Sequence, residues 1–304
     1  MKTKFSDLTT IEAISILTEL GDGETVKALS SIIEQDPGLK RIKLSELPES
    51  DELSSARWRG TEHTYGFIND SDEVNDHLNI SFASTVTADP DLKGKTINIK
   101  LGSLYTMNYP GWGRHNVLMH FKCKHAKKGS NETAIIEFEQ KFKSTEGEGA
   151  GNLGDFIFLG LCVPNNGLQF EVQTVNISND GDEEALKVLE SDTIKNGFDL
   201  VNTSFSALTP FTKMAQGVLG LLLSRNRNKI VQEFTIGFNF SNEGVEIAKL
   251  RIGTYVVAQV KKDELNWEDW VFQRSNGLVV KKSDPGIRLP YNHITFNVLR
   301  HDNS

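Results

Sequence analysis

The residues best suited to chemistry in this chain are Cys123 and His125, which lie two positions apart. The surrounding stretch alternates apolar and polar residues, so both side chains are expected on one face of a strand. A thiol beside an imidazole can act as nucleophile and base. Reactive cysteines, however, usually lie on turns or helix ends that lower their pKa. Because Cys123 continues an apolar stripe with Met119 and Phe121, we expect a buried thiol.

A second candidate is a calcium loop over residues 176–187. Asn176, Ser178 and Asp180 match the first three ligand positions of the calcium-loop template, and Gly181 matches its sharp turn. The template requires a bidentate glutamate at its last position, where this chain has Lys187. The missing carboxylate removes the strongest ligand, so we expect an acidic turn that caps the following helix.

A third candidate joins two acidic segments. Asp70 and Asp72 form one group, and Asp180 and Asp182 form another. Together they would line a calcium site at a sandwich edge if the two distant loops met. Runs of charge are usually solvated, so we expect no cofactor, with Ca²⁺ as the alternative.

Other catalytic signatures are absent from the sequence. Serine hydrolase, P-loop and dinucleotide-binding motifs are not found, and the glycine-rich stretch 146–154 carries acidic residues that would repel phosphate. We interpret that stretch as a hairpin connection that is open to proteolysis. The sequence therefore predicts a protein that is not an enzyme.

Aromatic residues give the best candidate for binding. Trp112 is flanked by glycines in the loop YPGWGR, at residues 109–114, and an exposed tryptophan there would anchor a protein partner or a sugar. Trp270 alternates with Phe272 and is expected in the core.

Composition limits the partners and the compartment. The 304 residues carry a net charge of -8, so a nucleic acid is not expected as a partner. Two cysteines, Cys123 and Cys162, fit a reducing compartment. The first twenty residues lack the continuous apolar core of a signal peptide, and no apolar run reaches the ~20 residues of a membrane span. We therefore expect a cytoplasmic protein.

The N-terminal residues predict a helical hairpin. Ile11, Ile14, Leu17 and Leu20 follow a helical spacing, and a second helix follows Gly23 and ends before residue 37. The hairpin either packs on the body of the protein or on a sister chain, or docks a partner through Ile14 and Leu17. Residues 40–60 are polar and are predicted to be a linker, so that 1–60 is one unit.

From residue 61 onward the period changes to two. Segments such as 97–101, 117–123 and 234–240 alternate apolar and polar residues, which predicts strands with one buried face. Glu137 and Glu139 are expected on the wet face of their strand. We predict a mostly β fold, a large antiparallel β-sandwich over 61–304 with a helical insertion at about 182–228; two tandem sandwiches are the alternative. The strand pattern resembles C2-like sandwiches, although no diagnostic motif marks that family.

The insertion ends in an apolar helix with a basic tail, residues 207–229. Its apolar stripe includes Met214, Val218, Leu221 and Leu222, and its tail contains Arg225 and Arg227. Because the segment is apolar nearly all round, we expect it to be buried on most sides, at the mouth or edge of the sandwich. The alternative is a membrane-active segment that reaches a membrane only after a conformational change.

These observations rank three functions. The first is a non-enzymatic cytoplasmic protein that acts through protein–protein contact, at Trp112 and the helical hairpin. The second is a toxin-like effector, activated by a protease, that releases the helix at 207–229. The third is a divergent enzyme that depends on a cysteine or a metal.

Overall fold

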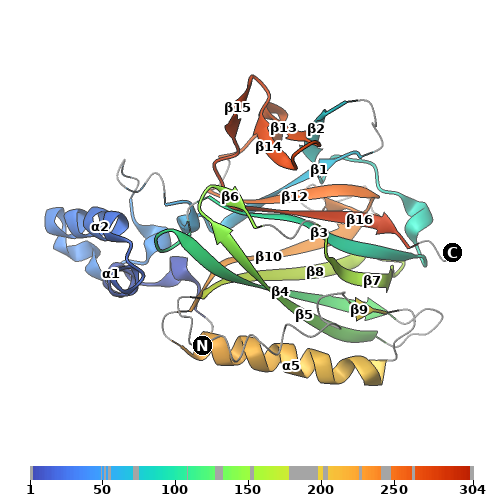
Figure 1. The fold of residues 1–304 in the computed structure, drawn as a ribbon, viewed down its shortest axis with the longest axis horizontal. Coiled ribbons are helices and arrows are strands. Elements are labelled where there is room, and N and C mark those ends of the chain that lie inside the picture. The colour runs from blue at the N-terminus through green and yellow to red at the C-terminus, as the bar shows by residue number, and fades with distance from the viewer. Residues whose placement is uncertain are drawn as a thin grey trace.

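The computed structural model shows two β-sheets packed face to face, with helices at one end and along one outer face (Figure 1). It describes residues 3–48, 50, 53, 56–70, 75–107, 109–126, 133–150, 154–177, 198–200, 205–225, 228–240, 248–261 and 264–301. The fold is thus a mostly antiparallel β-sandwich with few helices, as the sequence predicted. The narrower resemblance to C2-like sandwiches stays a prediction.

The strands fall into one large and one small sheet. The large sheet has the order β15-β14-β13-β2-β1-β12-β16-β3-β7-β9, with β6 also paired to β3; the small sheet has the order β11-β10-β8-β4-β5. The strands before the long helix are β1 (Glu62–Ile68), β2 (His77–Phe82), β3 (Thr96–Thr106), β4 (Arg114–Ala126), β5 (Thr133–Thr145), β6 (Glu148–Gly149), β7 (Phe156–Cys162), β8 (Leu168–Ile177) and β9 (Phe198–Asp199). Those after it are β10 (Lys229–Asn239), β11 (Ala248–Lys249), β12 (Gly253–Val260), β13 (Trp270–Gln273), β14 (Leu278–Lys281), β15 (Asp284–Arg288) and β16 (His293–Arg300).

Strands from both sides of the long helix share each sheet. In the large sheet β1 pairs with β12, and β3 pairs with β16; in the small sheet β8 pairs with β10. All three pairs are antiparallel. The two runs of strands therefore depend on each other for their hydrogen bonds, because each run alone lacks the partners of its central strands.

The N-terminal hairpin consists of α1 (Thr10–Glu19) and α2 (Gly23–Gln35), as the sequence predicted. Thr9 and Glu12 form a capping box at the start of α1, and Asp22 caps α2 by accepting a hydrogen bond from the backbone N–H of Thr25. These caps satisfy backbone donors that a helix start leaves free. The short turn between the helices is thereby fixed at Asp22.

Residues 40–60 are packed against the body, and the linker interpretation is wrong for their described part. Leu44, Leu47 and Trp58 are buried, and Phe5 packs edge-on against Trp58 with ring centroids 4.8 Å apart. The guanidinium group of Arg59 donates to the carbonyl oxygens of Leu44 and Leu47. A few large apolar side chains anchor this polar stretch to the body of the protein, and the average composition of the stretch does not reveal them.

The long helix, α5 (Phe205–Ser224), lies along the outer face of the small sheet, at the bottom of the view (Figure 1). Ala215, Val218, Leu219 and Leu222 are buried, whereas Leu221 is 49% exposed. The expectation of burial on most sides is therefore wrong, because the helix rests on the sandwich instead of entering it. The predicted helix at residues 182–190 lies outside the described residues.

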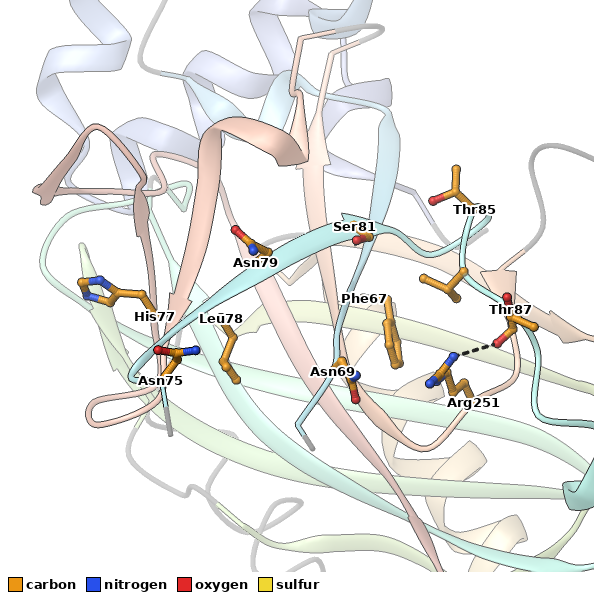
Figure 2. Close-up of a pocket in the computed structure, with 11 residues that line it drawn as sticks. Phe67, Asn69, Asn75, His77, Leu78, Asn79, Ser81, Thr85, Thr87 and Arg251 are labelled. Atoms are coloured by element: carbon orange, nitrogen blue, oxygen red, sulfur yellow. Dashed lines mark hydrogen bonds between the residues drawn. The ribbon is translucent and has the colours of Figure 1, made fainter. Parts of the chain in front are cut away.

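A cleft lies beside β2 on the inner face of the large sheet, and Figure 2 shows residues that line it. Ser81 pairs directly with Phe67 of β1, so His77, Asn79 and Ser81 share the face that Phe67 turns to the interior. Phe67 is buried, but the three polar residues of β2 are exposed. The sandwich interior therefore ends in a polar cleft at this edge.

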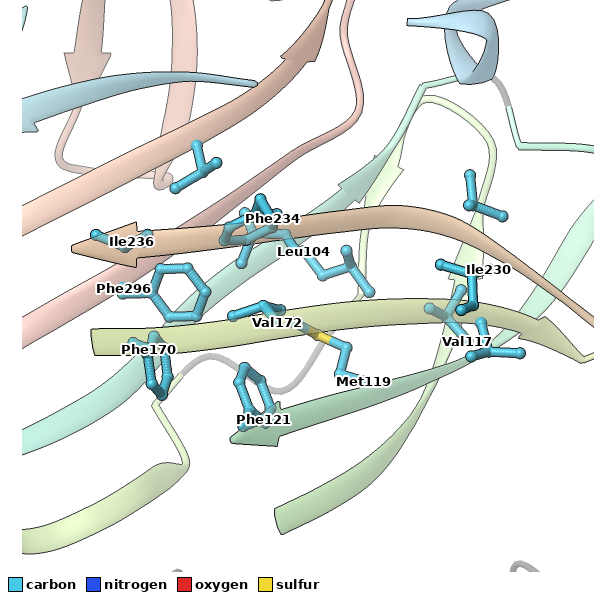
Figure 3. Packing of buried hydrophobic residues seen from close by; sticks show 14 of the residues in the cluster. Leu104, Val117, Met119, Phe121, Phe170, Val172, Ile230, Phe234, Ile236 and Phe296 are labelled. Atoms are coloured by element: carbon cyan, nitrogen blue, oxygen red, sulfur yellow. The ribbon is translucent and has the colours of Figure 1, made fainter. Parts of the chain in front are cut away.

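Aromatic rings fill the space between the sheets (Figure 3). Phe170 of β8 lies 5.8 Å from Phe121 of β4 and 5.6 Å from Phe296 of β16, measured between ring centroids. Phe234 of β10 lies 6.4 Å from Phe296. Edge-to-face and offset ring pairs at such separations add to the gain from apolar burial. This core fixes the two sheets against each other and so fixes the loops at their ends.

A buried histidine makes this stability depend on pH. His293 stacks on Tyr105 with centroids 4.6 Å apart, and its Nδ1 contacts the carbonyl oxygen of Tyr291 at 2.8 Å. Burial lowers the pKa of His293 to about 4, so the folded protein keeps the ring neutral. The unfolded chain, with a histidine pKa near ~6.5, binds the proton more readily. Its contribution to stability is therefore present above about pH 6.5 and is lost as the pH falls towards about 4.

We expect His293→Phe, which keeps a ring against Tyr105, to flatten this dependence. Urea unfolding of the wild type and the variant at pH 7 and pH 5 measures how much of the pH dependence of the unfolding free energy comes from this residue. The difference between the two pH values should shrink by about 2 kcal/mol in the variant. An unchanged difference would show that His293 titrates normally in the folded protein.

Candidate functional site

Trp112 is the most exposed large apolar side chain in the described structure. It is 73% exposed in the loop between β3 and β4, whereas Trp58, Trp267 and Trp270 are at most 9% exposed. The predictions of a buried Trp270 and an exposed Trp112 are therefore confirmed. A tryptophan left in water loses the free energy that burial of its large apolar surface would give.

The residues before Trp112 anchor its loop to the small sheet. Tyr109 is buried, and its hydroxyl group lies 2.8 Å from Thr174 Oγ1 and accepts a hydrogen bond from Gln232 Nε2 at 2.9 Å. Burial raises the pKa of Tyr109 to about 12, so the hydroxyl group stays protonated. Asn176 Nδ2 donates to the carbonyl oxygen of Pro110 at 2.6 Å. The loop is thus held by β8 and β10 together.

Asn176 is the first residue of the predicted calcium loop and the last of its candidate ligands that the structure describes. Its residue is buried in β8, and its side chain is used on Pro110. The remaining template positions, Ser178, Asp180, Gly181 and Lys187, lie outside the described residues. The calcium loop therefore stays a prediction, and the side-chain nitrogen of its first residue supports the Trp112 loop.

Glycines and the helical hairpin hold the other side of the loop. Gly111 and Gly113 have φ values of 115° and 84°, a backbone region that other residues rarely adopt. A Cβ atom on Gly111 would lie 3.4 Å from the Cβ of Leu20, so the hairpin packs directly on the loop. The backbone N–H of Gly111 donates to Asp22 Oδ2 at 3.4 Å. Trp112 therefore projects from a backbone that is fixed on both sides.

Three carboxylates surround this loop, and we call Asp22, Glu24 and Glu146 the acidic rim. The backbone N–H of Glu146 donates to the carbonyl oxygen of Gly113 at 3.4 Å. The pKa of Glu146 is raised, first by burial and then by the negative charges of Asp22 and Glu24. Arg114, next to the loop in sequence, is exposed. The three carboxylates therefore lie close enough to one another, beside the Trp112 loop, to raise the pKa of Glu146.

Ile14 and Leu17, the hairpin residues predicted to contact a partner, are not exposed. Leu17 is fully buried in the core, so it is not available to a partner, and this prediction is wrong. Ile14 is half-buried and packs against the same core. Ile11 instead is 51% exposed at the start of α1. The helical spacing therefore marked the buried face only in part: Leu17 belongs to it, Ile14 lies at its edge and Ile11 lies outside it.

The polar cleft beside β2 is the second candidate site, with a volume of about 480 Å³. Its lining includes Phe67, His77, Asn79, Ser81, Thr87 and Arg251 (Figure 2). These residues come from β1, from β2 and the segment after it, and from the turn before β12. No sequence pattern predicted this site, because Arg251 is separated from the other lining residues by more than half of the chain.

A buried charged cluster lies between the small sheet and α5. His120 Nδ1 is 3.0 Å from Glu139 Oε1, and His120 Nε2 is 3.5 Å from Glu137 Oε2. Gln216 of α5 donates to Glu137 Oε1 at 2.7 Å. Glu137 and Glu139 are buried, so their predicted place on a wet face is wrong: α5 covers that face.

This cluster is not arranged as a metal site. The carboxylates face opposite nitrogens of His120, so the three groups do not converge on one point. Among the described residues, no group of three or more histidine, cysteine, aspartate or glutamate side chains is placed to hold a metal ion. The cluster is also buried from any substrate.

Cys123 is buried, and burial raises the pKa of its thiol to about 12, so the buried-thiol prediction is confirmed; the side chain of His125 lies outside the described residues. Asp70 Oδ2 accepts a hydrogen bond from Thr254 at 2.7 Å. Asp72, Asp180 and Asp182 lie outside the described residues.

The predicted apolar segment, which includes most of α5, has buried, half-buried and exposed side chains. Val218 and Leu222 are buried, Met214 is half-buried against the core, and Arg225 is exposed; Arg227 lies outside the described residues. A Cβ atom at Gly217 or Gly220 would meet nothing within 4 Å. Within the described parts of the chain, no helix is both long and apolar enough to cross a membrane.

Comparison of the chain with protein-family models, curated proteins and solved structures returned no match.

Proposed function

We propose that this protein acts by binding a protein partner, without catalysing a reaction, and that the partner covers Trp112. One observation carries the proposal: Trp112 is 73% exposed on a loop whose neighbouring residues are fixed by hydrogen bonds. A fixed loop loses little conformational freedom on binding, so more of the gain from burying the indole ring remains as affinity. Tryptophan is also enriched among the residues that dominate binding at interfaces.

The acidic rim indicates what the partner looks like. Asp22, Glu24 and Glu146 lie beside the loop, and the whole chain carries a net charge of -8. A partner with an apolar slot for the indole ring and basic residues around it would complement this surface. Opposite charges on two partners accelerate their association, and this attraction weakens as the ionic strength rises. The interaction is therefore expected to depend on salt.

The two alternative functions have less support. Release of α5 onto a membrane would require Val218, Leu219 and Leu222 to leave the core. A thiol enzyme would require a reactive Cys123, whose pKa is raised by burial. The Trp112 surface needs no such change before it binds.

The test compares three immobilised proteins: the wild type, Trp112→Ala and Ile287→Ala. Ile287 is 45% exposed on β15 and serves as the matched control. We expect the wild type and the control to retain the same basic protein from a lysate, and Trp112→Ala to retain at least tenfold less, which is a typical loss for an interface tryptophan. Because Trp112 is exposed, its removal should leave the unfolding temperature unchanged.

Fluorescence quenching then locates the interface. Among four tryptophans, Trp112 alone is open to acrylamide, a neutral quencher that the acidic rim does not repel. Adding the purified partner should protect this tryptophan from quenching. Equal retention by Trp112→Ala, or an indole ring that is still quenched in the complex, would refute the proposal.

A further inference from the structure

The polar cleft beside β2 holds a cationic group that the described protein leaves largely unused. The guanidinium group of Arg251 makes one hydrogen bond, to the carbonyl oxygen of Thr87 at 3.4 Å, and no ion pair with the described residues (Figure 2). A guanidinium group has five N–H donors in a fixed plane. Most of the hydrogen-bonding capacity of Arg251 is therefore available to a ligand.

The backbone of Arg251 is held in place. Its N–H donates to the hydroxyl oxygen of Tyr255 at 2.9 Å, and that hydroxyl group lies 2.7 Å from the carbonyl oxygen of Lys249. Tyr255 is buried and packs edge-on against Phe67, with ring centroids 5.1 Å apart. The same buried pair of rings thus supports both the floor of the cleft and its arginine.

The nearby carboxylates have other partners. Asp70 is bound by Thr254, Asp76 accepts from the backbone N–H of Ser275, and Asp89 pairs with Arg300 at 3.0 Å. None of these three carboxylates is among the residues that line the cleft. Positive charge at Arg251 is therefore left without a described counter-ion, in a chain whose net charge is -8.

The rest of the lining offers neutral hydrogen-bonding groups. Asn79 and Ser81 project from alternate positions of β2, and Asn79 Oδ1 accepts from Lys282 Nζ at 3.2 Å. That bond orients the amide so that its nitrogen donates elsewhere. Amide and hydroxyl groups pair with ligand hydroxyl groups, whereas an apolar ligand would leave them without partners.

We propose that this cleft binds a small polyhydroxylated anion, a sugar that carries one phosphate or carboxylate group. The anionic group lies on Arg251, and the ring hydroxyl groups contact Asn79 and Ser81. A volume of about 480 Å³ accommodates such a molecule. This site is separate from the Trp112 surface and does not depend on the proposed protein partner.

Calorimetric titration of the full chain tests the proposal with four probes: glucose 6-phosphate, glucuronate, glucose and inorganic phosphate. At least one of the two acidic sugars is expected to bind one to one, and more tightly than glucose or inorganic phosphate. The acidic sugar that binds more tightly shows which anionic group the cleft prefers. Arg251→Gln should weaken that binding at least about tenfold, which is typical for loss of a charge-assisted contact.

Matched variants separate the site from general charge effects. Arg114→Gln removes the same charge from an exposed residue beside Trp112 and should leave sugar binding unchanged. Asn79→Asp places a negative charge at an exposed position of the cleft and should weaken it as strongly as Arg251→Gln, which keeps the test valid if the Arg251 variant is unstable. The proposal is overturned if neither acidic sugar binds saturably, if inorganic phosphate binds as tightly as glucose 6-phosphate, or if both cleft variants bind like the wild type.

Discussion

Replacing His120 by leucine is expected to lower the free energy of unfolding by about 3 kcal/mol or more. Glu139 is 1% exposed and Glu137 is 7% exposed, and the imidazole ring lies between their carboxylates. Removing the ring leaves two buried acidic groups close together without the imidazole that lies between them. Urea unfolding of the wild type and the variant at pH 7 measures the loss.

A second variant shows whether the loss comes from the unbalanced charge. His120→Leu combined with Glu139→Leu removes both members of the closest pair, so the double variant should recover most of the stability. Glu137 keeps the hydrogen bond from Gln216 in both variants. If the double variant is less stable than His120→Leu alone, packing around His120 and not charge balance would explain the loss.

The cluster also explains why α5 stays on the sheet. Gln216 donates to Glu137, and the backbone N–H of Glu137 lies 3.4 Å from Thr212 Oγ1. These contacts fix the helix over β5 in one position, while Val218 and Leu222 supply the apolar burial. A polar layer of this kind is specific because any shift of the helix would leave buried groups without partners.

Local patterns in the sequence predicted most of the elements. The spacing of Ile11, Ile14 and Leu17 predicted the first helix of the hairpin, because helical periodicity acts over a few residues. Alternation over 117–123 and 234–240 likewise predicted strands that the structure contains. Such signals report which face is buried but not which neighbour buries it.

The errors arise where the neighbour matters. Glu137 and Glu139 belong to the polar face of β5, and only the position of α5 makes that face buried. Leu17 was correctly placed on an apolar face, yet the direction of that face depends on the sandwich. Propensity and periodicity carry no information on these distant contacts.

The two candidate sites differ in how far local sequence predicts them. Trp112 could be predicted as exposed because two flanking glycines mark its loop, although its anchors Tyr109, Thr174 and Gln232 could not. The cleft with Arg251 depends wholly on the pairing of β1 with β2 and β12. A site built from such separate segments appears only once the sheet is assembled.

The second large effect is expected at the turn before β8, where Gly167→Ala should lower the free energy of unfolding by about 3 kcal/mol or more. Gly167 has a φ of 96°, and a Cβ atom there would collide with the carbonyl oxygen of Phe238. The backbone of β10 cannot move away easily, because Leu168 pairs with Phe238 at the start of a long ladder. The strand that follows carries Thr174 and Asn176, the anchors of the Trp112 loop.

Gly217→Ala is the matched control, since it makes the same substitution in open space. Gly217 lies within α5, and an added Cβ atom would meet nothing within 4 Å. Alanine is the better helix former, so this variant should gain about 0.8 kcal/mol. Urea unfolding of both variants measures the two changes, and acrylamide quenching shows whether the Trp112 loop is disturbed. A stable Gly167→Ala protein would mean that the turn before β8 adopts another conformation, and the anchoring of the Trp112 loop through β8 would then need a different explanation.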